Sequence, residues 1–199
     1  LEADERYPDG CFVEDTAIVN GKVAVITHPG AASRRGEEVE IARVISGYRK
    51  TETIAFPGTL EGGDILKVEN HYFIGLSGRT NKEGADQLVA ILSKYGFTSS
   101  EIKVEAGLHL KSDIAYLGKG NFISTPAFSK MIYPANTIIL DQDECYSANC
   151  LLVNDILLIP KGFTESKTKI ADLGYNIIEL EMSEFRKMDG GLTCLSLLF

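Results

Sequence analysis

Short apolar segments occur in pairs along the chain, and a tight turn joins the two members of each pair. The four pairs are residues 12–19 with 23–27, 65–68 with 72–76, 114–117 with 122–124, and 151–153 with 156–159. The first turn is Asn20-Gly21 and the second is Glu69-Asn70, and we expect these residues to tolerate the positive φ that a short hairpin loop requires. The pattern predicts four β-hairpins. The first three turns recur at intervals of about 50 residues, which indicates an array of one supersecondary unit.

Each hairpin is followed by a segment with helical spacing and then by a further apolar strand. In residues 35–50 the side chains of Val39, Ala42 and Ile45 recur on one side, while charged residues take the other positions. Apolar residues three and four apart are typical of an amphipathic helix. We therefore expect a helix over 35–50 with this stripe buried, followed by a strand over 54–56.

The second unit shows the same order with clearer boundaries. Asn81 is a suitable N-cap for a helix over 81–95, and Gly96 lies where a helix C-cap is expected. The predicted buried stripe of this helix is Leu88, Ile91 and Leu92.

The third and fourth units differ in the strength of their helical pattern. The fourth has a helix over 164–173, ended by Gly174, and a strand over 176–180. The third has only a short helix around 129–133, stopped by a proline. The repeated unit is therefore strand, strand, helix, strand. We expect residues 192–198 to form the opening strand of a fifth copy, so the fold class is a cyclic α/β repeat.

Composition indicates an ordinary globular chain. Its 199 residues, 44% apolar and 24% charged, can bury a substantial core without being divided, so we expect a single domain over 1–199. No apolar run approaches membrane-spanning length, and the first residues lack the features of a signal peptide, so a cytoplasmic location is expected. The first residue is not Met and the repeat is interrupted, from which we expect that an N-terminal segment has been left out.

The net charge of −8 bears on the kind of partner. Duplex recognition draws its affinity from clustered Lys and Arg residues, and here acids are interspersed with bases, so nucleic acid is not an expected partner. Acidic residues near the start point instead to a cationic ligand. Glu2, Asp4 and Glu5 are assigned to the solvated surface.

The four cysteines do not suggest a disulfide framework, because their spacing is irregular and a chain of this length does not need one. Cys145 and Cys150 lack a second pair of ligands, so a structural zinc site is not expected. Cys11 and Cys150 are predicted to be small buried hydrophobes. Cys194 follows a pair of glycines that permit close backbone approach, so its thiol is a candidate nucleophile.

A polar cluster precedes the first strand of every unit. The clusters are Asp9, Glu14 and Asp15; Glu61 and Asp64; His109 and Asp113; Asn149 and Cys150; and Asp189 and Cys194. If five units circle one axis, equivalent positions converge there, so Glu61, His109 and Cys194 would be neighbours. A cysteine nucleophile needs a proton-handling partner and an orienting group, and these three residues supply that set. His28 and His71 are assigned to turns or the surface.

Six motifs extend along the whole chain in a fixed order. They are Phe12-Val13-Glu14-Asp15, Thr27-His28-Pro29-Gly30 with Ser33-Arg34-Arg35, Glu61-Gly62-Gly63-Asp64, Gly75-Leu76-Ser77-Gly78-Arg79-Thr80-Asn81, His109-Leu110-Lys111-Ser112 and Gly190-Gly191-Leu192-Thr193-Cys194. Together they resemble the dimethylarginine dimethylaminohydrolase family of the guanidino-group-modifying (pentein) superfamily. The resemblance implies a five-bladed α/β propeller of ββαβ units, with part of one N-terminal unit missing from this chain.

The resemblance also implies an activity, the hydrolysis of Nω-methylated arginine to citrulline and a methylamine without a cofactor. Cys194 would attack the guanidinium carbon and form a covalent thiouronium intermediate. His109 would protonate the departing amine and then activate water. Glu61 would orient and charge-stabilise His109. A thiolate and an imidazole are also suitable ligands for zinc, so Cys194 and His109 could capture Zn²⁺ as an inhibitory ion.

The implied substrate-binding residues are Asp9, Glu14, Asp15, Arg34, Arg79 and Met188. Asp15, with Glu14 beside it, would hold the guanidinium, and Asp9 would meet the α-ammonium. The two arginines would bind the α-carboxylate, for which a planar guanidinium with two parallel donors is suited. Their alternative role is surface pairing with nearby acids such as Glu37 or Glu38. Met188 would contribute only its backbone.

Three alternatives stay open from the sequence. Arginine deiminase, or a related hydrolase of citrulline or agmatine type, would share the same three catalytic residues. An amidinotransferase would need an amine acceptor in place of water. A propeller without catalytic activity would act as a binding module. The expected partner is a small cationic amino acid, with a homodimer as the candidate assembly and no membrane or nucleic acid.

Overall fold

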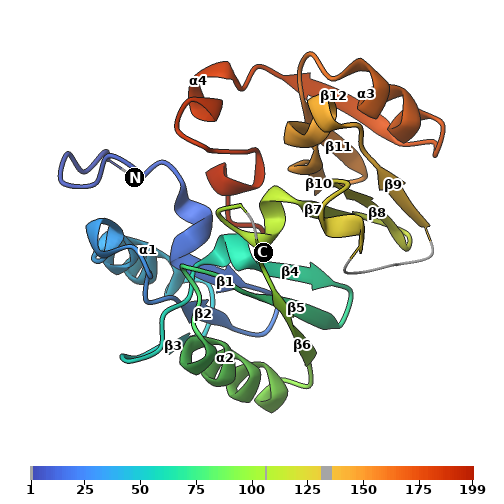
Figure 1. Cartoon of the computed structure of the whole chain (residues 1–199). Helices are drawn as coiled ribbons and strands as arrows, with labels where there is room; N and C mark the ends of the chain where they lie inside the picture. The colour runs from blue at the N-terminus through green and yellow to red at the C-terminus, as the bar shows by residue number, and fades with distance from the viewer. Residues whose placement is uncertain (1, 106, 131–135) are drawn as a thin grey trace. The chain divides into compact units, whose positions relative to one another are not determined.

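The computed structural model describes residues 2–105, 107–130 and 136–199. The chain divides into two compact units, and each is described by itself. The first holds the residues up to Leu110 together with Cys194–Phe199, and the second holds Lys111–Thr193. Small three-stranded sheets recur in both units (Figure 1). The single domain predicted over 1–199 stays a prediction.

The first unit contains two sheets of the same construction. In one sheet β1 (Ala17–Val19) pairs antiparallel with β2 (Ala24–Ile26), which pairs parallel with β3 (Thr51–Thr53). In the other sheet β4 (Ile65–Val68) pairs antiparallel with β5 (His71–Leu76), which pairs parallel with β6 (Thr98–Lys103). The helices α1 (Glu37–Ile45) and α2 (Lys82–Lys94) connect the second strand to the third.

The second unit repeats this construction. One sheet is formed by β7 (Ile114–Gly118), β8 (Asn121–Ser124) and β9 (Asn136–Ile139), and the other by β10 (Leu151–Val153), β11 (Ile156–Pro160) and β12 (Asn176–Leu180). The helix α3 (Thr164–Ala171) connects β11 to β12, and α4 (Ser183–Arg186) follows β12. Each of the four sheets formed by the described residues has three strands with one antiparallel and one parallel pairing, as expected for ββαβ units. The connecting helix of the unit is described in three of them, as α1, α2 and α3.

Apolar side chains fill the interior of each unit. In the first unit the side chains of Val25, Ile74 and Leu88, from β2, β5 and α2, have no exposed surface. In the second unit Leu117 and Leu157 are likewise fully buried. Burying a side chain of this size contributes about 1.5–3 kcal/mol. These cores hold the sheet ends in place, and the polar clusters lie at those ends.

The boundaries predicted for α2 are confirmed. The side chain of Asn81 accepts a hydrogen bond from the backbone N–H of Gly84 at 2.8 Å, which satisfies a donor in the first turn of the helix. Gly96 follows the helix with φ of 79°, a left-handed conformation that glycine adopts without steric cost. The predicted stripe of Leu88, Ile91 and Leu92 is buried.

The stripe predicted for α1 is partly wrong. Val39 is 65% exposed, and the buried residues of this helix are Glu37, Ile41 and Ile45. These three follow each other at intervals of four residues, so the helix is turned to bury a carboxylate at its start. The apolar pattern could not predict this, because burial of Glu37 depends on its ion pair with Arg34.

Three strand predictions also need correction. Residues 13–16 form a 3₁₀ turn rather than the start of β1. The strand predicted over 54–56 lies earlier, at β3, and Phe56 is 81% exposed. Residues 192–198 are not a strand, because Thr193–Leu195 forms a 3₁₀ turn and no described strand pairs with this segment. The fifth blade of the propeller stays a prediction.

The helix predicted around 129–133 lies partly outside the described residues. Within them, Phe128–Lys130 forms a 3₁₀ turn.

Most of the polar clusters fall in or beside a 3₁₀ turn. These turns are Val13–Thr16 before β1, Gly62–Asp64 before β4, Leu110–Ser112 before β7, Gln142–Ala148 before β10, and Thr193–Leu195. Asp15, Asp64 and Cys194 lie inside such turns, while Glu61, His109 and Asn149 lie directly at their ends. In the four units that contain a sheet, the polar side chains therefore lie where the chain enters the first strand, while the turn of Cys194 is not followed by a strand.

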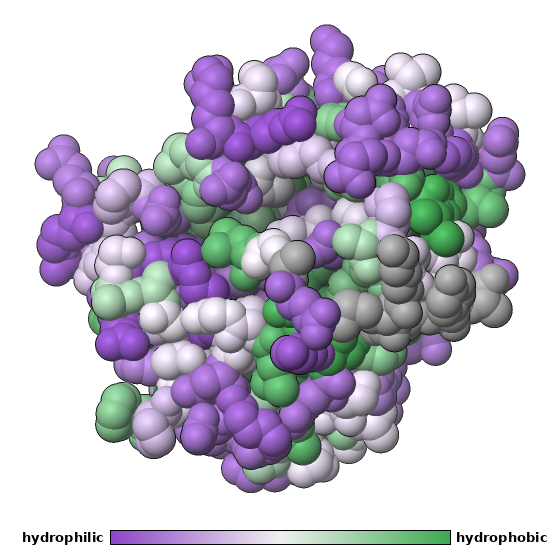
Figure 2. Space-filling view, in the orientation of Figure 1, coloured by the Kyte–Doolittle hydropathy of each residue, from purple (hydrophilic) through white to green (hydrophobic). Residues whose placement is uncertain are grey.

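Hydrophilic residues cover most of the face shown in Figure 2, and hydrophobic groups show between them. Among the described residues, no helix is both long enough and apolar enough to span a bilayer.

Candidate active site

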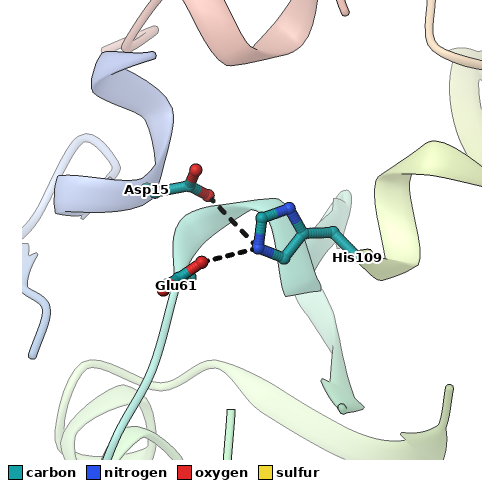
Figure 3. Close-up of side chains that lie close together, drawn as sticks. All are labelled: Asp15, Glu61 and His109. Carbon is teal, nitrogen blue, oxygen red and sulfur yellow. Dashed lines mark hydrogen bonds and ion pairs between the residues drawn. The ribbon is translucent and has the colours of Figure 1, made fainter. Parts of the chain in front are cut away.

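The imidazole of His109 lies against the carboxylate of Glu61, although 48 residues separate them in the chain. His109 Nε2 is 2.8 Å from Glu61 Oε2, and the two residues are 5% and 0% exposed. Figure 3 shows the ring directed at the carboxylates of Glu61 and Asp15, which come from different segments. The structure thus brings Glu61 and His109 together, while their catalytic roles stay predictions.

Three donors converge on the carboxylate of Glu61. Besides His109, the backbone N–H of Ala31 donates to Oε1 at 3.0 Å, and Arg79 Nη1 lies 3.3 Å from the same oxygen. Burial by itself would raise the pKa of Glu61, but the hydrogen bonds from His109 and Ala31 and the nearby positive charges outweigh it and lower the pKa to about 2. Glu61 is therefore an anion at neutral pH.

The same contact acts on His109 in the opposite direction. Burial lowers the pKa of an imidazole, but the hydrogen bond to Glu61 and the negative charges of Asp15, Asp64 and Glu61 outweigh it and raise the pKa of His109. Asp15 Oδ1 lies 3.9 Å from His109 Nε2. His109 therefore keeps its proton at a higher pH than an ordinary histidine, which suits a general acid.

A second buried network joins Asp15 to Arg34. The Arg34 guanidinium donates from Nη1 to Asp15 Oδ2 and from Nη2 to Glu37 Oε2 at 2.7 Å, and Nη2 also donates to the carbonyl oxygen of Phe12 at 2.9 Å. The three charged side chains are 7%, 4% and 3% exposed. The pair of Arg34 with Glu37 forms in the interior rather than at the surface. The predicted binding of the substrate α-carboxylate by Arg34 stays a prediction.

Two glycines let the segment before β4 pass through this region. A Cβ on Gly62 would lie 2.0 Å from the backbone oxygen of Glu14, and a Cβ on Gly63 would lie 2.6 Å from the His109 ring. The N–H of Gly63 also donates to Asp15 Oδ1 at 2.7 Å. A side chain at either position would push apart the segments that carry Asp15 and His109.

The remaining predicted binding residues lie in different settings. Glu14 is buried, Asp9 is half-buried, and the Arg79 side chain is 30% exposed. Arg79 contacts Glu61 only at long distances, 3.3 and 3.4 Å. Met188 belongs to the second unit, where it is 47% exposed after α4.

Cys194 belongs to the same compact unit as Glu61 and His109. It is half-buried in the 3₁₀ turn Thr193–Leu195. Leu197, three positions later, packs against the core formed by β1, β2 and α1. The segment that carries the thiol is therefore attached to the unit that carries the imidazole.

The other cysteines have different surroundings. Cys150 is 3% exposed, as predicted, and burial raises the pKa of its thiol to about 12. Cys11 is exposed, so the prediction that it is a buried hydrophobe is wrong. The apolar strand expected to cover it does not begin at Phe12, because the chain forms a 3₁₀ turn there. The four cysteines form no disulfide with one another.

One group of described side chains has donor atoms close enough to share a metal ion. Asp15, Glu61 and His109 each offer one atom, and these atoms lie within 4.8 Å of one another. The carboxylates of Asp15 and Glu61 already accept hydrogen bonds, Asp15 from Arg34 and Gly63 and Glu61 from His109. The inhibitory zinc site predicted at Cys194 and His109 stays a prediction.

Sequence reasoning missed two parts of this site. The pairing of Arg34 with Glu37 was considered only at the surface, whereas the structure buries it, and the only sequence signal of the pair is its spacing of three residues. Asp64 was recognised as part of a polar cluster but was given no role. It is fully buried, and its signal is a carboxylate set between two glycines and an apolar strand, where a solvated surface residue is not expected.

Comparisons with known proteins agree with this fold. The model of the arginine deiminase family matches residues 12–158. The N(G),N(G)-dimethylarginine dimethylaminohydrolase of Pseudomonas aeruginosa is 45% identical over the whole of this chain and 80% of its own length. The enzyme of that name from Streptomyces coelicolor is 33% identical over 98% of this chain and 77% of its own.

A solved structure of the Pseudomonas aeruginosa protein is also similar to this chain. A cysteine-to-serine mutant of the Pseudomonas aeruginosa protein, complexed with citrulline, superposes with a TM-score of 0.93 at 44% identity, covering 98% of this chain and 78% of its own. The repeated ββαβ sheets are those of the α/β propeller enzymes that act on guanidino groups. The chain belongs to the dimethylarginine dimethylaminohydrolase family.

Proposed function

We propose that this protein hydrolyses Nω-methylated L-arginine, with dimethylarginine as the preferred form, to L-citrulline and the corresponding methylamine. The observation that carries the proposal is the identity of 45% to a dimethylarginine dimethylaminohydrolase along the whole chain. The buried pair of His109 and Glu61 supports it, because such a pair can hold a proton ready for a departing amine. No cofactor takes part in the proposed reaction.

In the first step the Cys194 thiolate forms a bond to the guanidinium carbon. The bond from that carbon to the methylated nitrogen then breaks, and His109 gives its proton to the departing amine, leaving an S-alkylthiouronium on Cys194. Glu61 is bound to Nε2, so Nδ1, the other ring nitrogen, is the atom assigned to this transfer (Figure 3). The negative charge of Glu61 stabilises the protonated ring before the transfer.

In the second step the neutral imidazole takes a proton from water while the water oxygen bonds to the same carbon. The carbon–sulfur bond then breaks and the thiolate is restored, while the second proton of the water passes to solvent, where the released amine takes it up. Water and dimethylarginine thus give citrulline and dimethylamine, and the enzyme returns to its starting protonation state. Covalent catalysis suits this substrate, because a delocalised guanidinium is a poor electrophile and has to be held in attack geometry.

Acidic residues are assigned to the cationic ends of the substrate. Asp15, with Glu14 beside it, holds the guanidinium, and Asp9 holds the α-ammonium. Each carboxylate oxygen has two lone pairs, so Asp15 can bind the substrate while it accepts from Arg34 and Gly63. Buried acids are costly without a counter-charge, and the substrate supplies one.

Two arginines and one backbone segment are assigned to the α-amino-acid end. Arg79 is the better placed of the two arginines for the α-carboxylate, because its side chain is 30% exposed and its contacts to Glu61 are long. Arg34 contributes mainly by fixing Asp15. Met188 contributes its backbone.

The decisive assay identifies the released amine. Purified protein is incubated with asymmetric dimethylarginine or with arginine, and the products are separated by chromatography. The proposal expects citrulline with dimethylamine from the first substrate and little ammonia from the second. Ammonia from arginine at the higher kcat/KM would assign the chain to the arginine deiminase reaction, after which the matching family model is named.

A cytoplasmic location, a homodimer and inhibition by Zn²⁺ are parts of the same proposal. Cell fractionation and sedimentation velocity test the first two. For the third, activity is measured against added Zn²⁺ with and without a chelator, and a Cys194→Ala variant should bind Zn²⁺ more weakly in a competition assay.

A further inference from the structure

Asp64 is fully buried at the end of the 3₁₀ turn Gly62–Asp64, three residues after Glu61. Its carboxylate accepts hydrogen bonds from two other segments. Oδ1 accepts from the backbone N–H of Leu110 at 3.0 Å, and Oδ2 accepts from the hydroxyl of Ser77 at 2.6 Å. Leu110 directly follows His109 in the chain. One carboxylate therefore joins the segment of Glu61 to that of His109 and to the turn after β5.

The contact with Ser77 continues toward Arg79. Ser77 Oγ accepts from the backbone N–H of Arg79 at 2.9 Å and from that of Thr80 at 3.2 Å. Thr80 Oγ1 in turn accepts from the backbone N–H of Glu61 at 3.2 Å. The chain of hydrogen bonds that begins at Asp64 thus fixes the turn that carries Arg79 and returns to Glu61.

The absence of a side chain at Gly75 leaves room for the contact between Asp64 and Leu110. Gly75 lies on β5 opposite the carboxylate, and a Cβ there would lie 3.0 Å from both Asp64 Oδ1 and Leu110 Cβ. A contact of that length is tighter than ordinary packing, so a side chain at this position would require Asp64 or Leu110 to shift.

We propose that Asp64 is a positioning residue that holds His109 and the turn of Arg79 in place, through Leu110 and Ser77 respectively. Asp64 does not touch the reacting atoms in this scheme. The kinetic part of the test rests on the proposed function, because it measures turnover of dimethylarginine. The effect on His109 is measured on the free protein without substrate.

The charge of Asp64 also acts on His109. The charged groups that face the imidazole are Glu61 at 2.8 Å, Asp15 at 3.9 Å, and Asp64, with Arg79 and Arg34 behind the first two. Burial raises the pKa of Asp64, while the positive His109 and the hydrogen bonds from Ser77, Thr80 and Leu110 favour its ionised form. Removing this charge therefore removes part of what keeps His109 protonated.

The test variant is Asp64→Asn, which keeps the size of the side chain. An amide has one acceptor oxygen, so either the N–H of Leu110 or the hydroxyl of Ser77 loses its acceptor. The chain has three histidines, so the imidazole of His109 can be followed by NMR titration of the free protein. We expect the midpoint of the His109 titration to move to lower pH, because a nearby negative charge that favours the protonated imidazole is removed. We expect kcat/KM for dimethylarginine to fall at least tenfold.

Asp113→Asn is the matched control. Asp113 directly precedes β7 as Asp64 directly precedes β4, and its Oδ1 accepts from the hydroxyl of Thr125 at 2.8 Å. Burial raises the pKa of Asp113 as well. This variant should leave the His109 midpoint unchanged, whatever it does to the unfolding midpoint.

A second variant, Ser77→Ala, separates the two contacts. It keeps the charge of Asp64 and its bond to Leu110 but removes the acceptor used by Arg79 and Thr80. The expected result is a higher KM with a smaller change in kcat and an unshifted His109 midpoint.

Three outcomes are decisive. An unshifted His109 midpoint in Asp64→Asn overturns the proposal, as does an equal shift in Asp113→Asn. Wild-type protein that releases no amine, together with a midpoint shift confined to Asp64→Asn, overturns the proposed function and leaves the positioning of His109 supported.

Discussion

Asn149 holds Thr193 through two hydrogen bonds: the N–H of Thr193 donates to Asn149 Oδ1 at 2.9 Å, and Asn149 Nδ2 donates to Thr193 Oγ1 at 3.1 Å. The same amide nitrogen donates to the carbonyl oxygen of Lys111 at 3.0 Å. A Cβ on Gly191 would lie 2.4 Å from the Asn149 side chain, so this glycine makes room for the amide. One buried side chain thus fixes the residue directly before Cys194.

Asn149→Ala should therefore slow the modification of Cys194. The change leaves the buried N–H of Thr193 without its acceptor, which costs about 1–3 kcal/mol of unfolding free energy. It also frees the backbone next to the thiol, so the rate of labelling by an arginine-like chloroacetamidine should fall several-fold. Mass mapping identifies the labelled cysteine, and urea denaturation gives the stability.

Asn176→Ala serves as the comparison, because Asn176 is exposed at the start of β12. It should label at the wild-type rate. Equal labelling rates in Asn149→Ala and wild type would show that the amide does not position the Cys194 segment.

The Cys194→Ser variant should lose turnover but should still bind the substrate. A serine hydroxyl is far less nucleophilic than a thiolate, so kcat should fall by at least a thousandfold, and binding by the surrounding acids should persist. Isothermal titration calorimetry measures the binding and amine release measures the rate. Cys145→Ser, at a half-buried position in the second unit, should keep near-normal activity. Near-normal rates in Cys194→Ser would place the nucleophile elsewhere.

The sequence predicted most of the repeat, because turn residues and apolar spacing are local signals. The bounds of β4, β10 and β12 are as predicted, and Asn81 caps α2 as expected. The 3₁₀ turns before the strands were not predicted. They depend on long-range contacts such as that of Gly63 with Asp15, which no local pattern encodes.

The site was predicted as a set of residues rather than as a network. Glu61 and His109 were expected to meet because they occupy equivalent places in successive units, and they do. The burial of Arg34 between Asp15 and Glu37 was not expected. An ion pair is buried only when both partners arrive in the interior together, and the sequence of either segment alone does not reveal that.

The ionisation of Glu61 should make the free energy of unfolding fall as the pH is lowered into the acid range. Its pKa is lowered from 4.5 to about 2 in the folded state, a difference that corresponds to about 3 kcal/mol of unfolding free energy. A lowered pKa stabilises the folded state above the unfolded pKa, so this contribution should be present at pH 6 and lost as the pH falls from about 5 toward 2. Urea denaturation of wild type and Glu61→Gln across this range measures it.

The difference between wild type and Glu61→Gln should narrow as the pH falls. Glu83→Gln, at an exposed position in the first turn of α2, should follow the wild-type curve. A constant difference between wild type and Glu61→Gln from pH 6 to pH 3 would mean that the carboxylate does not act through its charge.

The raised pKa of His109 predicts a loss of stability and of activity at alkaline pH. A group with a raised pKa stabilises the folded state below its unfolded value, near 6.5, and this contribution is lost as the pH rises through the folded value. The proton needed for the departing amine is lost over the same interval, so kcat/KM should fall at alkaline pH. Glu61→Gln should move this fall to lower pH. An identical alkaline limb in both proteins would exclude His109 as its source.

Arg34→Ala should destabilise the protein strongly, because it leaves the carboxylates of Asp15 and Glu37 buried without their counter-ion. The Arg34 side chain is 7% exposed, and removing one partner from a buried pair costs about 3–5 kcal/mol. Arg43→Ala is the matched control, since Arg43 pairs with Glu40 at the same spacing on the exposed face of α1 and should change stability little. Urea denaturation at pH 7 compares the two variants. Equal unfolding free energies would show that water solvates the carboxylates that Arg34→Ala leaves unpaired.

Arg34→Lys should recover only part of the loss, because an ammonium cannot reach Asp15, Glu37 and the Phe12 carbonyl together as the planar guanidinium does.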